Sequence, residues 1–279
     1  MEKDGLRKKN KNNVVTYLIL GLLVVVFLIP IYVLVITGFK SFEEFSLSTM
    51  WLPPKTWHFE NYIESFKTLL PNAKNSFIMV PSAAILSSLI GSFNGYILSK
   101  WKFKGSNYVF AAILLGMFIP YQAILIPLVQ FLKSIGLYSS LPGLILAHTV
   151  YGIPITSLIF RNYYAEIPNE LVEVTKIDGG GIFDIYFRIL LPLSLPGFAV
   201  ATIWQFTSIW NDFLFGVIIT PNPKLQPITV ALRNIAGSLV VEWNMQMSAA
   251  LISTIPTLTL YLLLGRYFIR GLLAGSLKG

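Results

Sequence analysis

Six stretches of about twenty predominantly apolar residues restrict the fold of this chain more than any other feature of its sequence. An α-helix needs about 20 such residues to cross the hydrocarbon core of a bilayer. Only 12% of the 279 residues are charged, too few to give these stretches a water-compatible surface. The sequence therefore predicts an all-α membrane protein with six transmembrane helices, and it excludes a soluble enzyme and a nucleic-acid-binding protein. The predicted spans are 14–39, 75–98, 108–132, 141–160, 195–220 and 247–268.

Two absences narrow the chemistry further. The chain has no cysteine and only two histidines, His58 and His148, so the sequence predicts no disulfide framework and no metal site. It also has no G-x-x-x-x-G-K-[ST] phosphate loop. We therefore expect neither ATP hydrolysis nor a bound cofactor on this chain.

The distribution of basic residues predicts the orientation in the membrane. With six spans and the N-terminus inside, fourteen of the 21 lysines and arginines fall on the cytoplasmic side and seven outside. Cytoplasmic loops carry such an excess, so both termini are expected in the cytoplasm. The membrane domain is then 14–270, with a basic cytoplasmic N-terminus at 1–13 and a cytoplasmic tail at 271–279. An external segment at 41–74, rich in tryptophan and proline, is suited to form a folded cap at the membrane surface.

The cytoplasmic segment 161–194 is the most informative part of the chain. Proline at 168 and an acidic first turn predict a short helix over 168–178, which Gly179 and the next two glycines end. A second short helix is predicted at about 182–190, ahead of Pro192. Such an element could lie among lipid headgroups as an amphipathic anchor. Its acidic face, with Glu170 and Glu173, favours a protein partner instead, because the inner leaflet is anionic.

This segment resembles the signature of ABC-importer permeases, E-A-A, three residues, G, nine residues, I-x-L-P. Glu173, Gly179, Ile189 and Leu191-Pro192 match it without a gap. The chain departs from it at Val174 and Thr175, which replace the two alanines. The longer form found in sugar permeases, I-P-x-E-L-x-E-A-A-x-x-D-G-A, is matched at Ile167, Pro168, Glu170, Leu171, Glu173, Asp178 and Gly179, with Gly180 in place of the last alanine.

The resemblance extends along the chain, to the carbohydrate-uptake permeases and among them to the maltose-type second permease. The matching segments are Trp51–Tyr62, which ends in Asn61-Tyr62, Asn75-Ser76 at the start of the second span, Trp210-Asn211-Asp212-Phe213 in the fifth span, and the tail 265–279.

The resemblance implies the ABC importer permease fold, with 161–194 as a cytoplasmic coupling loop in a multi-pass protein of the cell membrane. It implies a non-catalytic subunit that pairs with a second permease, two ATP-binding subunits that carry ATP and Mg²⁺, and an extracytoplasmic solute-binding protein. Membrane lipid is the surrounding solvent and no nucleic acid is expected. The residues implied to couple to the ATPases are Glu170, Leu171, Glu173, Val174, Asp178 and Gly179.

Polar residues inside the predicted spans are candidates for the translocation path. Asp212 is the one acid well inside a span, and a charge at mid-membrane costs at least about 2.5 kcal/mol. Carboxylates and amides can bond sugar hydroxyls, and aromatic rings can stack on sugar faces. Hydrogen bonding between helices is the alternative role for these residues. The candidates are His148 and Tyr151 in the fourth span and Gln205, Trp210, Asn211 and Asp212 in the fifth.

Small residues and prolines mark helix packing and bending. Ser87, Gly91 and Gly95 form a ridge that predicts close helix approach. Prolines inside spans, such as Pro120 and Pro154, predict kinks.

The function expected from the resemblance is import of a sugar or oligosaccharide, driven by ATP on partner chains. Three alternatives stay open. One is import of another small polar solute such as glycerol phosphate, and one is an ion-driven secondary carrier that uses Asp212. The third is a purely structural membrane subunit. Transport that needs ATP and separate partner chains distinguishes the importer from the last two.

Overall fold

The structure is a computed structural model that describes residues 2–101, 103–237 and 241–276, with side chains for 14–101, 103–237 and 241–265. The described residues form helices joined by turns and loops, as predicted for an all-α protein. Lys102 and Lys278, which contribute to the predicted orientation, lie outside the described residues. The same holds for the side chains of the basic residues in 2–13 and 266–276.

Four helices are long and apolar enough to cross a membrane among the described residues. Two bent helix pairs raise this number to six if each pair counts as one span. The four helices are α1 (Glu2–Gly38), α2 (Glu60–Lys100), α5 (Leu141–Glu166) and α12 (Trp243–Ser276). The bent pairs are 106–118 with 121–134, and 182–193 with 195–210.

The third predicted span, 108–132, is not one helix. It consists of α3 (Ser106–Leu115), η1 (Gly116–Phe118), η2 (Tyr121–Ile124) and α4 (Leu125–Ser134), with a bend of 89° at the break. Ile119 and Pro120 have extended backbone there. Proline lacks an N–H and disfavours a helical residue before it, so Pro120 ends the first segment rather than only kinking it.

The fifth predicted span, 195–220, is also interrupted. Helix α9 (Leu195–Trp210) ends before Asn211, and a separate helix, α10 (Leu214–Ile219), follows. The Asp212 carboxylate accepts hydrogen bonds from the N–H groups of Phe215 and Gly216, at 3.0 and 3.3 Å. A side chain that bonds the free N–H groups of a first turn starts a new helix.

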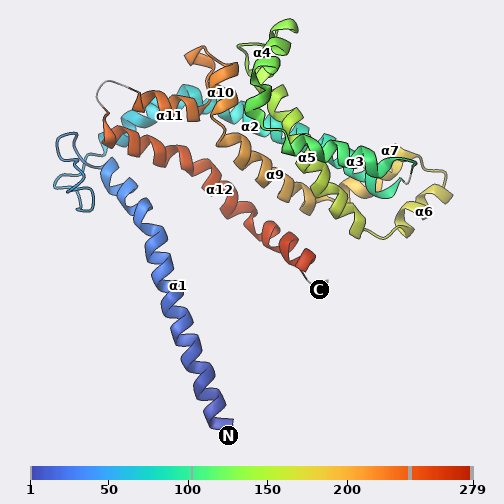
Figure 1. Cartoon of the computed structure of the whole chain (residues 1–279), viewed down its shortest axis with the longest axis horizontal. Coiled ribbons are helices and arrows are strands. Elements are labelled where there is room, and N and C mark those ends of the chain that lie inside the picture. Colours follow the sequence, from blue (N-terminus) through green and yellow to red (C-terminus); the bar gives the residue numbers. More distant parts are fainter. Residues whose placement is uncertain (1, 102, 238–240, 277–279) are drawn as a thin grey trace. The chain divides into compact units, whose positions relative to one another are not determined.

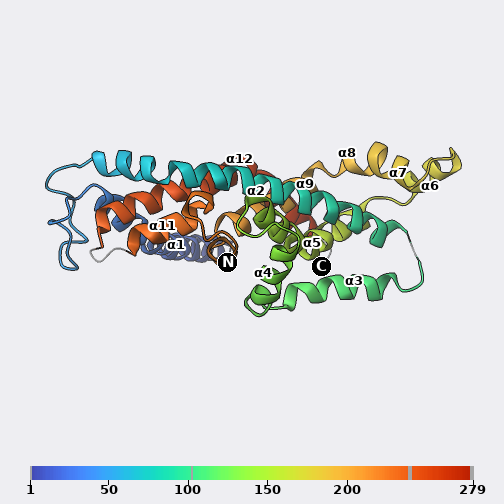
Figure 2. The ribbon, with the colours of Figure 1, turned by 90° about the horizontal axis from the view of Figure 1, so that it is seen from above.

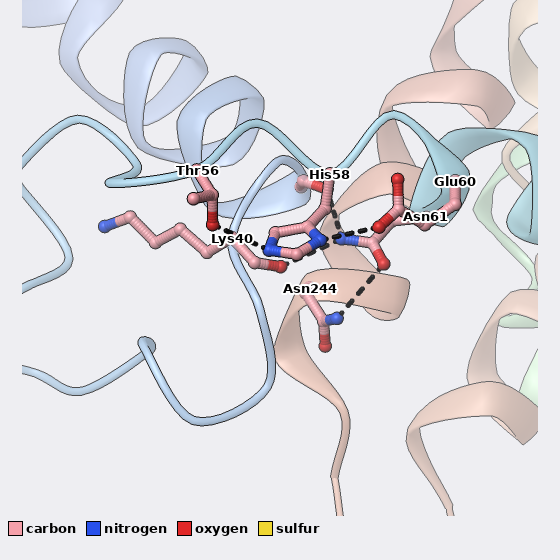
Figure 3. A network of polar contacts seen from close by, with 7 residues as sticks. Lys40, Thr56, His58, Glu60, Asn61 and Asn244 are labelled. Atoms are coloured by element: carbon pink, nitrogen blue, oxygen red, sulfur yellow. Dashed lines mark hydrogen bonds and ion pairs between the residues drawn. The ribbon is translucent and has the colours of Figure 1, made fainter.

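The chain divides into two compact units, and the first comprises Met1–Thr68 and Asn234–Ile252. Its polar centre is Asn61, whose Nδ2 donates to the carbonyls of Gly38 and Lys40, each at 2.9 Å (Figure 3). Asn244 in α12 donates to Asn61 Oδ1 at 3.4 Å. Asn61 therefore ties the end of α1, the start of α2 and the start of α12 together.

The segment 41–74, which the sequence predicts to be external, is folded, and its residues from Glu60 onward belong to α2. The ring of Phe39 lies 4.5 Å from that of Tyr62, 5.0 Å from Phe59 and 5.1 Å from Trp57. Lys40 is fully buried and its Nζ donates to the Thr49 carbonyl at 2.7 Å. Burial lowers the pKa of Lys40, and the nearby Glu44 carboxylate opposes this shift.

The second unit comprises Leu69–Arg233 and Ser253–Gly279. Its α2 and α5 meet at the predicted ridge of small residues, where Thr156 Oγ1 donates to the Ser87 carbonyl at 2.9 Å. A Cβ at Gly91 would lie 2.1 Å from Thr156 Oγ1, and one at Gly95 would lie 2.6 Å from the backbone nitrogen of Arg161. The contact depends on glycine, as predicted.

Helix α9 packs against α5 in this unit. Figure 1 shows α10 near one end of α9 and the helices α6 (Glu170–Ile177) and α7 (Ile182–Asp184) beyond the other. Figure 2 shows α6 and α7 at the end where α2 finishes. The segment with η4 (Pro223–Leu225), ahead of α11 (Ile228–Ala236), is held to α2, because Ser76 Oγ accepts from the Ile228 N–H at 2.9 Å.

Candidate functional site

The coupling loop folds as a helix, a glycine turn and a second helical segment. Helix α6 (Glu170–Ile177) ends at a left-handed residue, Gly179, with φ +81°. The Gly180 N–H donates to the Thr175 carbonyl at 2.8 Å, and the Gly179 N–H to the Lys176 carbonyl at 3.0 Å. These two bonds form a Schellman motif, which satisfies carbonyls that would otherwise be orphaned at the helix end.

The second segment differs from the short α-helix predicted over 182–190. Three residues, Ile182–Asp184, form α7, and Ile185–Leu190 form a π-helical turn, η3. Pro192 does not end the element, because α8 (Leu191–Leu193) continues it. Proline is tolerated in the first turn of a helix, where its missing N–H has no partner to lose.

All six residues implied to couple to the ATPases lie on the exposed surface of the loop. Leu171 is 42% exposed and Val174 57% exposed, beside the exposed carboxylates of Glu170 and Glu173. Val172 points the other way and is 3% exposed within the hydrophobic core. Helix α6 is thus anchored by one side and leaves an apolar and acidic side exposed.

Basic residues hold the loop to the end of α2, a role that the sequence pattern did not reveal. Lys100 Nζ donates to Asn169 Oδ1 at 2.8 Å and to the Ile167 carbonyl at 2.5 Å. Lys176 Nζ lies 4.1 Å from the centroid of the Trp101 ring, a cation–π contact. These pairs join residues far apart in sequence, so no local spacing pointed to them.

Two adjoining cavities lie between α5 and the break after α9. The larger has a volume of about 510 Å³ and the smaller about 190 Å³. His148, Tyr151 and Ser208 line both. The larger volume falls within the range of small-molecule sites, roughly 300–1,000 Å³.

His148 lines both cavities and keeps an unpaired, enclosed polar atom beside them. The residue is 6% exposed, and its Nε2 has no hydrogen-bond partner. Asp212 Oδ2 lies 3.7 Å from that Nε2, which is too far for a hydrogen bond. A buried polar group without a partner is costly, and this nitrogen is closed off from solvent, so a bound hydroxyl would reach it only after a small shift of the cavity wall.

Asp212 and Asn211 line the larger cavity, but both have structural bonds as well. Asp212 starts α10, and its carbonyl accepts from Thr229 Oγ1 at 2.6 Å. Asn211 Nδ2 donates to the Thr207 carbonyl at 2.8 Å. The polar residues at the break therefore shape the cavity and hold its wall.

The two candidates in α9, Gln205 and Trp210, serve helix packing. Gln205 lines the smaller cavity, and its Nε2 donates to the Gly152 carbonyl of α5 at 2.9 Å. Trp210 lines neither cavity. Its ring stacks on Phe206 at 5.5 Å and its Nε1 donates to the Ser253 carbonyl at 2.9 Å. The structure brings His148, Tyr151, Gln205, Asn211 and Asp212 together and places Trp210 elsewhere.

An aromatic wall completes the larger cavity, and of its three rings the sequence predicted only Tyr151. The ring centroids of Tyr121 and Tyr151 lie 6.0 Å apart, and each lies 5.6 Å from the ring centroid of Phe215. Tyr121 reaches this place because the third span breaks at Pro120. Discontinuous transmembrane helices often border binding sites, so the proline inside the third span was the sequence feature that could have pointed to Tyr121.

The cavities suit a neutral polar molecule. Asp212 is the one charged side chain among the described residues that line them, and none of those residues is Lys or Arg. The described part of the chain also holds no cluster of His, Asp or Glu that could bind a metal ion. Hydroxyls, a carboxylate, an imidazole and aromatic faces can bind a sugar, whereas a phosphate would lack a cationic partner.

Comparisons with known proteins agree with this architecture. Residues 87–273 match the family described as binding-protein-dependent transport system inner membrane component. A probable ABC transporter permease protein of Pyrococcus horikoshii is 45% identical over 98% of this chain and all of its own. The glucose import system permease protein of Saccharolobus solfataricus is 33% identical, covering 94% of this chain and 95% of its own. In a bacterial ABC transporter that imports alginate, one chain superposes with a TM-score of 0.81 at 20% identity, covering 94% of this chain and 98% of that one.

Proposed function

The chain belongs to the binding-protein-dependent transport system inner membrane components, the permeases of ABC importers, and on this premise we propose that it forms part of the path for a neutral sugar or oligosaccharide. As a permease it is a non-catalytic, multi-pass subunit of the cell membrane, without bound cofactors. Such permeases assemble with ATPases and a binding protein. We infer that this chain pairs with a second permease and two ATP-binding subunits, with both termini in the cytoplasm.

The observation that carries the sugar assignment is the cavity bordered by His148, Asp212 and the aromatic wall. The hydroxyls of its lining match a ligand rich in hydroxyl groups, and the unpaired imidazole nitrogen of His148 lies enclosed beside it. Its single charge is negative, which disfavours glycerol phosphate and other anions. The similarity to a glucose import permease supports the same class of substrate.

The alternative of an ion-driven carrier finds less support at Asp212. Both the carboxylate and the carbonyl of this residue bond to neighbouring backbone or side-chain groups. A proton or sodium carrier needs a carboxylate that is free to change its partners during transport. The position of Asp212 at the start of α10 favours a fixed structural acceptor that also borders the cavity.

Uptake by the reconstituted transporter tests the proposal. The complex with its ATPases and binding protein is placed in vesicles and offered radiolabelled glucose, maltose or glycerol phosphate, with and without ATP inside. We expect ATP-dependent uptake of a neutral sugar and none of glycerol phosphate. Uptake of glycerol phosphate alone, or uptake that an ion gradient drives without ATP, would reject the assignment.

A pair of variants tests the cavity itself. His148→Leu removes the free nitrogen, and we expect sugar uptake to fall about tenfold, the scale of one lost hydrogen bond to the substrate. Thr149→Val is the control, because Thr149 is 5% exposed, lines neither cavity, and its Oγ1 has no partner. Equal losses in both variants would mean that His148 matters only for packing.

A further inference from the structure

Four buried hydroxyl groups connect the coupling loop to the helices that border the cavities. They belong to Ser92 in α2, Tyr164 in α5, Tyr186 in η3 and Ser194 between α8 and α9. Ser92 Oγ lies 2.6 Å from Tyr164 OH and 3.1 Å from Tyr186 OH. Tyr164 OH lies 3.1 Å from Ser194 Oγ. Residues as far apart in the chain as Ser92 and Ser194 thus meet at one line of oxygen atoms.

The hydrogens in this line have a single consistent arrangement. Ser194 donates to the Leu191 carbonyl at 2.9 Å, so its oxygen accepts from Tyr164. Since a hydroxyl has only one hydrogen, Tyr164 must accept from Ser92, and Ser92 in turn accepts from Tyr186. We call these four groups the hydroxyl chain. Every donor in it has an acceptor, and hydrogen bonds in such chains strengthen one another.

The hydroxyl chain is closed to water and surrounded by packed rings. Ser92, Tyr164 and Ser194 are fully buried, and Tyr186 is 3% exposed. The ring of Tyr186 stacks on that of Tyr96 at 5.6 Å, and Tyr96 OH donates to the Ile182 carbonyl at 3.1 Å. A group displaced from this chain would find no replacement partner, so the arrangement is stiff.

The exposed side of the loop is therefore open to contact, whereas its buried side is bound to the neighbouring helices. The side with Leu171 and Val174 is exposed, while Tyr186 binds η3 to Ser92 of α2 and, through Ser92, to Tyr164 of α5. Helix α5 carries His148 and Tyr151, and Ser194 begins α9, which ends at the cavity. A displacement of the loop would be passed to both walls of the cavity as long as the hydroxyl chain holds.

We propose that the hydroxyl chain makes the coupling loop, α5 and the start of α9 one rigid body, with Tyr164 and Tyr186 as positioning residues that transmit ATPase movement to the cavity. This inference rests on the proposed function, because it presumes that partner ATPases move the loop. Tyr164 and Tyr186 touch neither substrate nor ATPase in this scheme. They act through the helices that they join.

The order of the groups predicts a graded effect of mutation. Tyr186 is the first donor, so Tyr186→Phe removes one bond and leaves no donor unpaired. Tyr164 lies inside the chain, so Tyr164→Phe removes two bonds and leaves the Ser92 hydroxyl without an acceptor. We expect the ratio of sugar transported to ATP hydrolysed to fall about tenfold for Tyr164→Phe and less for Tyr186→Phe.

Tyr163→Phe is the matched control. Tyr163 is the neighbour of Tyr164 on α5, and its OH donates to the Leu193 carbonyl at 2.7 Å without joining the hydroxyl chain. The substitution is the same and one bond to the same loop is lost. We expect the ratio of transport to hydrolysis to stay at the wild-type value.

Distance measurements on the assembled transporter test rigidity directly. The chain has no cysteine, so spin labels can be attached at Arg188→Cys in η3 and Val150→Cys in α5, whose side chains are 79% and 55% exposed. Distances are measured by electron paramagnetic resonance without nucleotide and after trapping with MgATP and vanadate. We expect one narrow distance in both states for the wild type and the control. We expect a broadened or state-dependent distance for Tyr164→Phe.

The outcomes separate the two levels of inference. A wild-type complex that neither traps nucleotide nor imports sugar would reject the proposed function. A functional wild type whose loop already moves relative to α5 would overturn the rigid-body inference alone. The same holds if Tyr164→Phe and Tyr186→Phe keep both the narrow distance and the wild-type ratio. Should Tyr164→Phe fail to assemble, Tyr186→Phe still decides the matter, because it leaves no donor unpaired.

Discussion

At the scale of single residues, Gly179 is the clearest test of the coupling loop. Its φ of +81° strains any β-branched residue by about 1–2 kcal/mol, whereas no atom lies within 4 Å of a Cβ placed there. The cost of Gly179→Val is therefore a backbone cost, and Gly179→Asn should avoid most of it because asparagine tolerates this geometry. We expect Gly179→Val to insert in the membrane but to uncouple ATP hydrolysis from uptake, and Gly179→Asn to resemble the wild type. ATP hydrolysis and sugar uptake are measured in the same vesicles. Wild-type coupling of the two in Gly179→Val would contradict a role of this turn in docking the ATPases.

Asp212 allows charge and capping to be separated at one position. Asparagine caps a helix about as well as aspartate, so Asp212→Asn removes the charge but keeps the start of α10. Asp212→Ala removes both and should cost about 1 kcal/mol of stability. We expect both variants to transport less sugar, and only Asp212→Ala to lower the melting temperature of the purified complex. Normal uptake in Asp212→Asn would mean that the carboxylate serves structure only.

At the scale of helices, the contact between α2 and α5 depends on Gly91. A Cβ there would lie 2.1 Å from Thr156 Oγ1 and 2.8 Å from the backbone nitrogen of Ser157, so the helices must separate. We expect Gly91→Ala to destabilise the subunit by about 1–3 kcal/mol, the usual cost of overpacking. Gly265→Ala in α12 is the control, since no atom lies within 4 Å and alanine there favours the helix by about 0.5–1 kcal/mol. Thermal unfolding in detergent compares the two, and equal melting temperatures would contradict the close contact.

Helix boundaries show where local patterns suffice and where they do not. Hydropathy identified the six apolar stretches, but two of them are broken, at Pro120 and at Asp212. A proline inside a span can kink a helix or end it, and the neighbouring helices decide which. Asp212 was visible as an intramembrane acid, yet whether it faced a ligand or started a helix depended on the path of the next residues.

At the scale of the whole molecule, the predicted orientation in the membrane rests on the excess of basic residues on one side. We expect a cysteine at the exposed residue Asn107 to react with a membrane-impermeant reagent only from the cytoplasmic side. A cysteine at Lys55, in the external segment, should react only from outside. The natural chain has no cysteine, so neither signal has a background. Labelling with the opposite preference would overturn the predicted orientation.

The sequence by itself determined the properties that depend on neighbours in the chain. These are the all-helical membrane fold, the coupling loop, the left-handed turn at Gly179 and the ridge of small residues on α2, because hydropathy, glycine and helical spacing act over a few residues. The tertiary structure alone decided that Trp210 packs on Phe206, away from the cavity that His148 borders, and that Ser92 meets Tyr164 at a distance of 72 residues along the chain. Such contacts depend on how whole helices approach and rotate, and the free energy that fixes them is shared among many side chains rather than encoded at any one spacing.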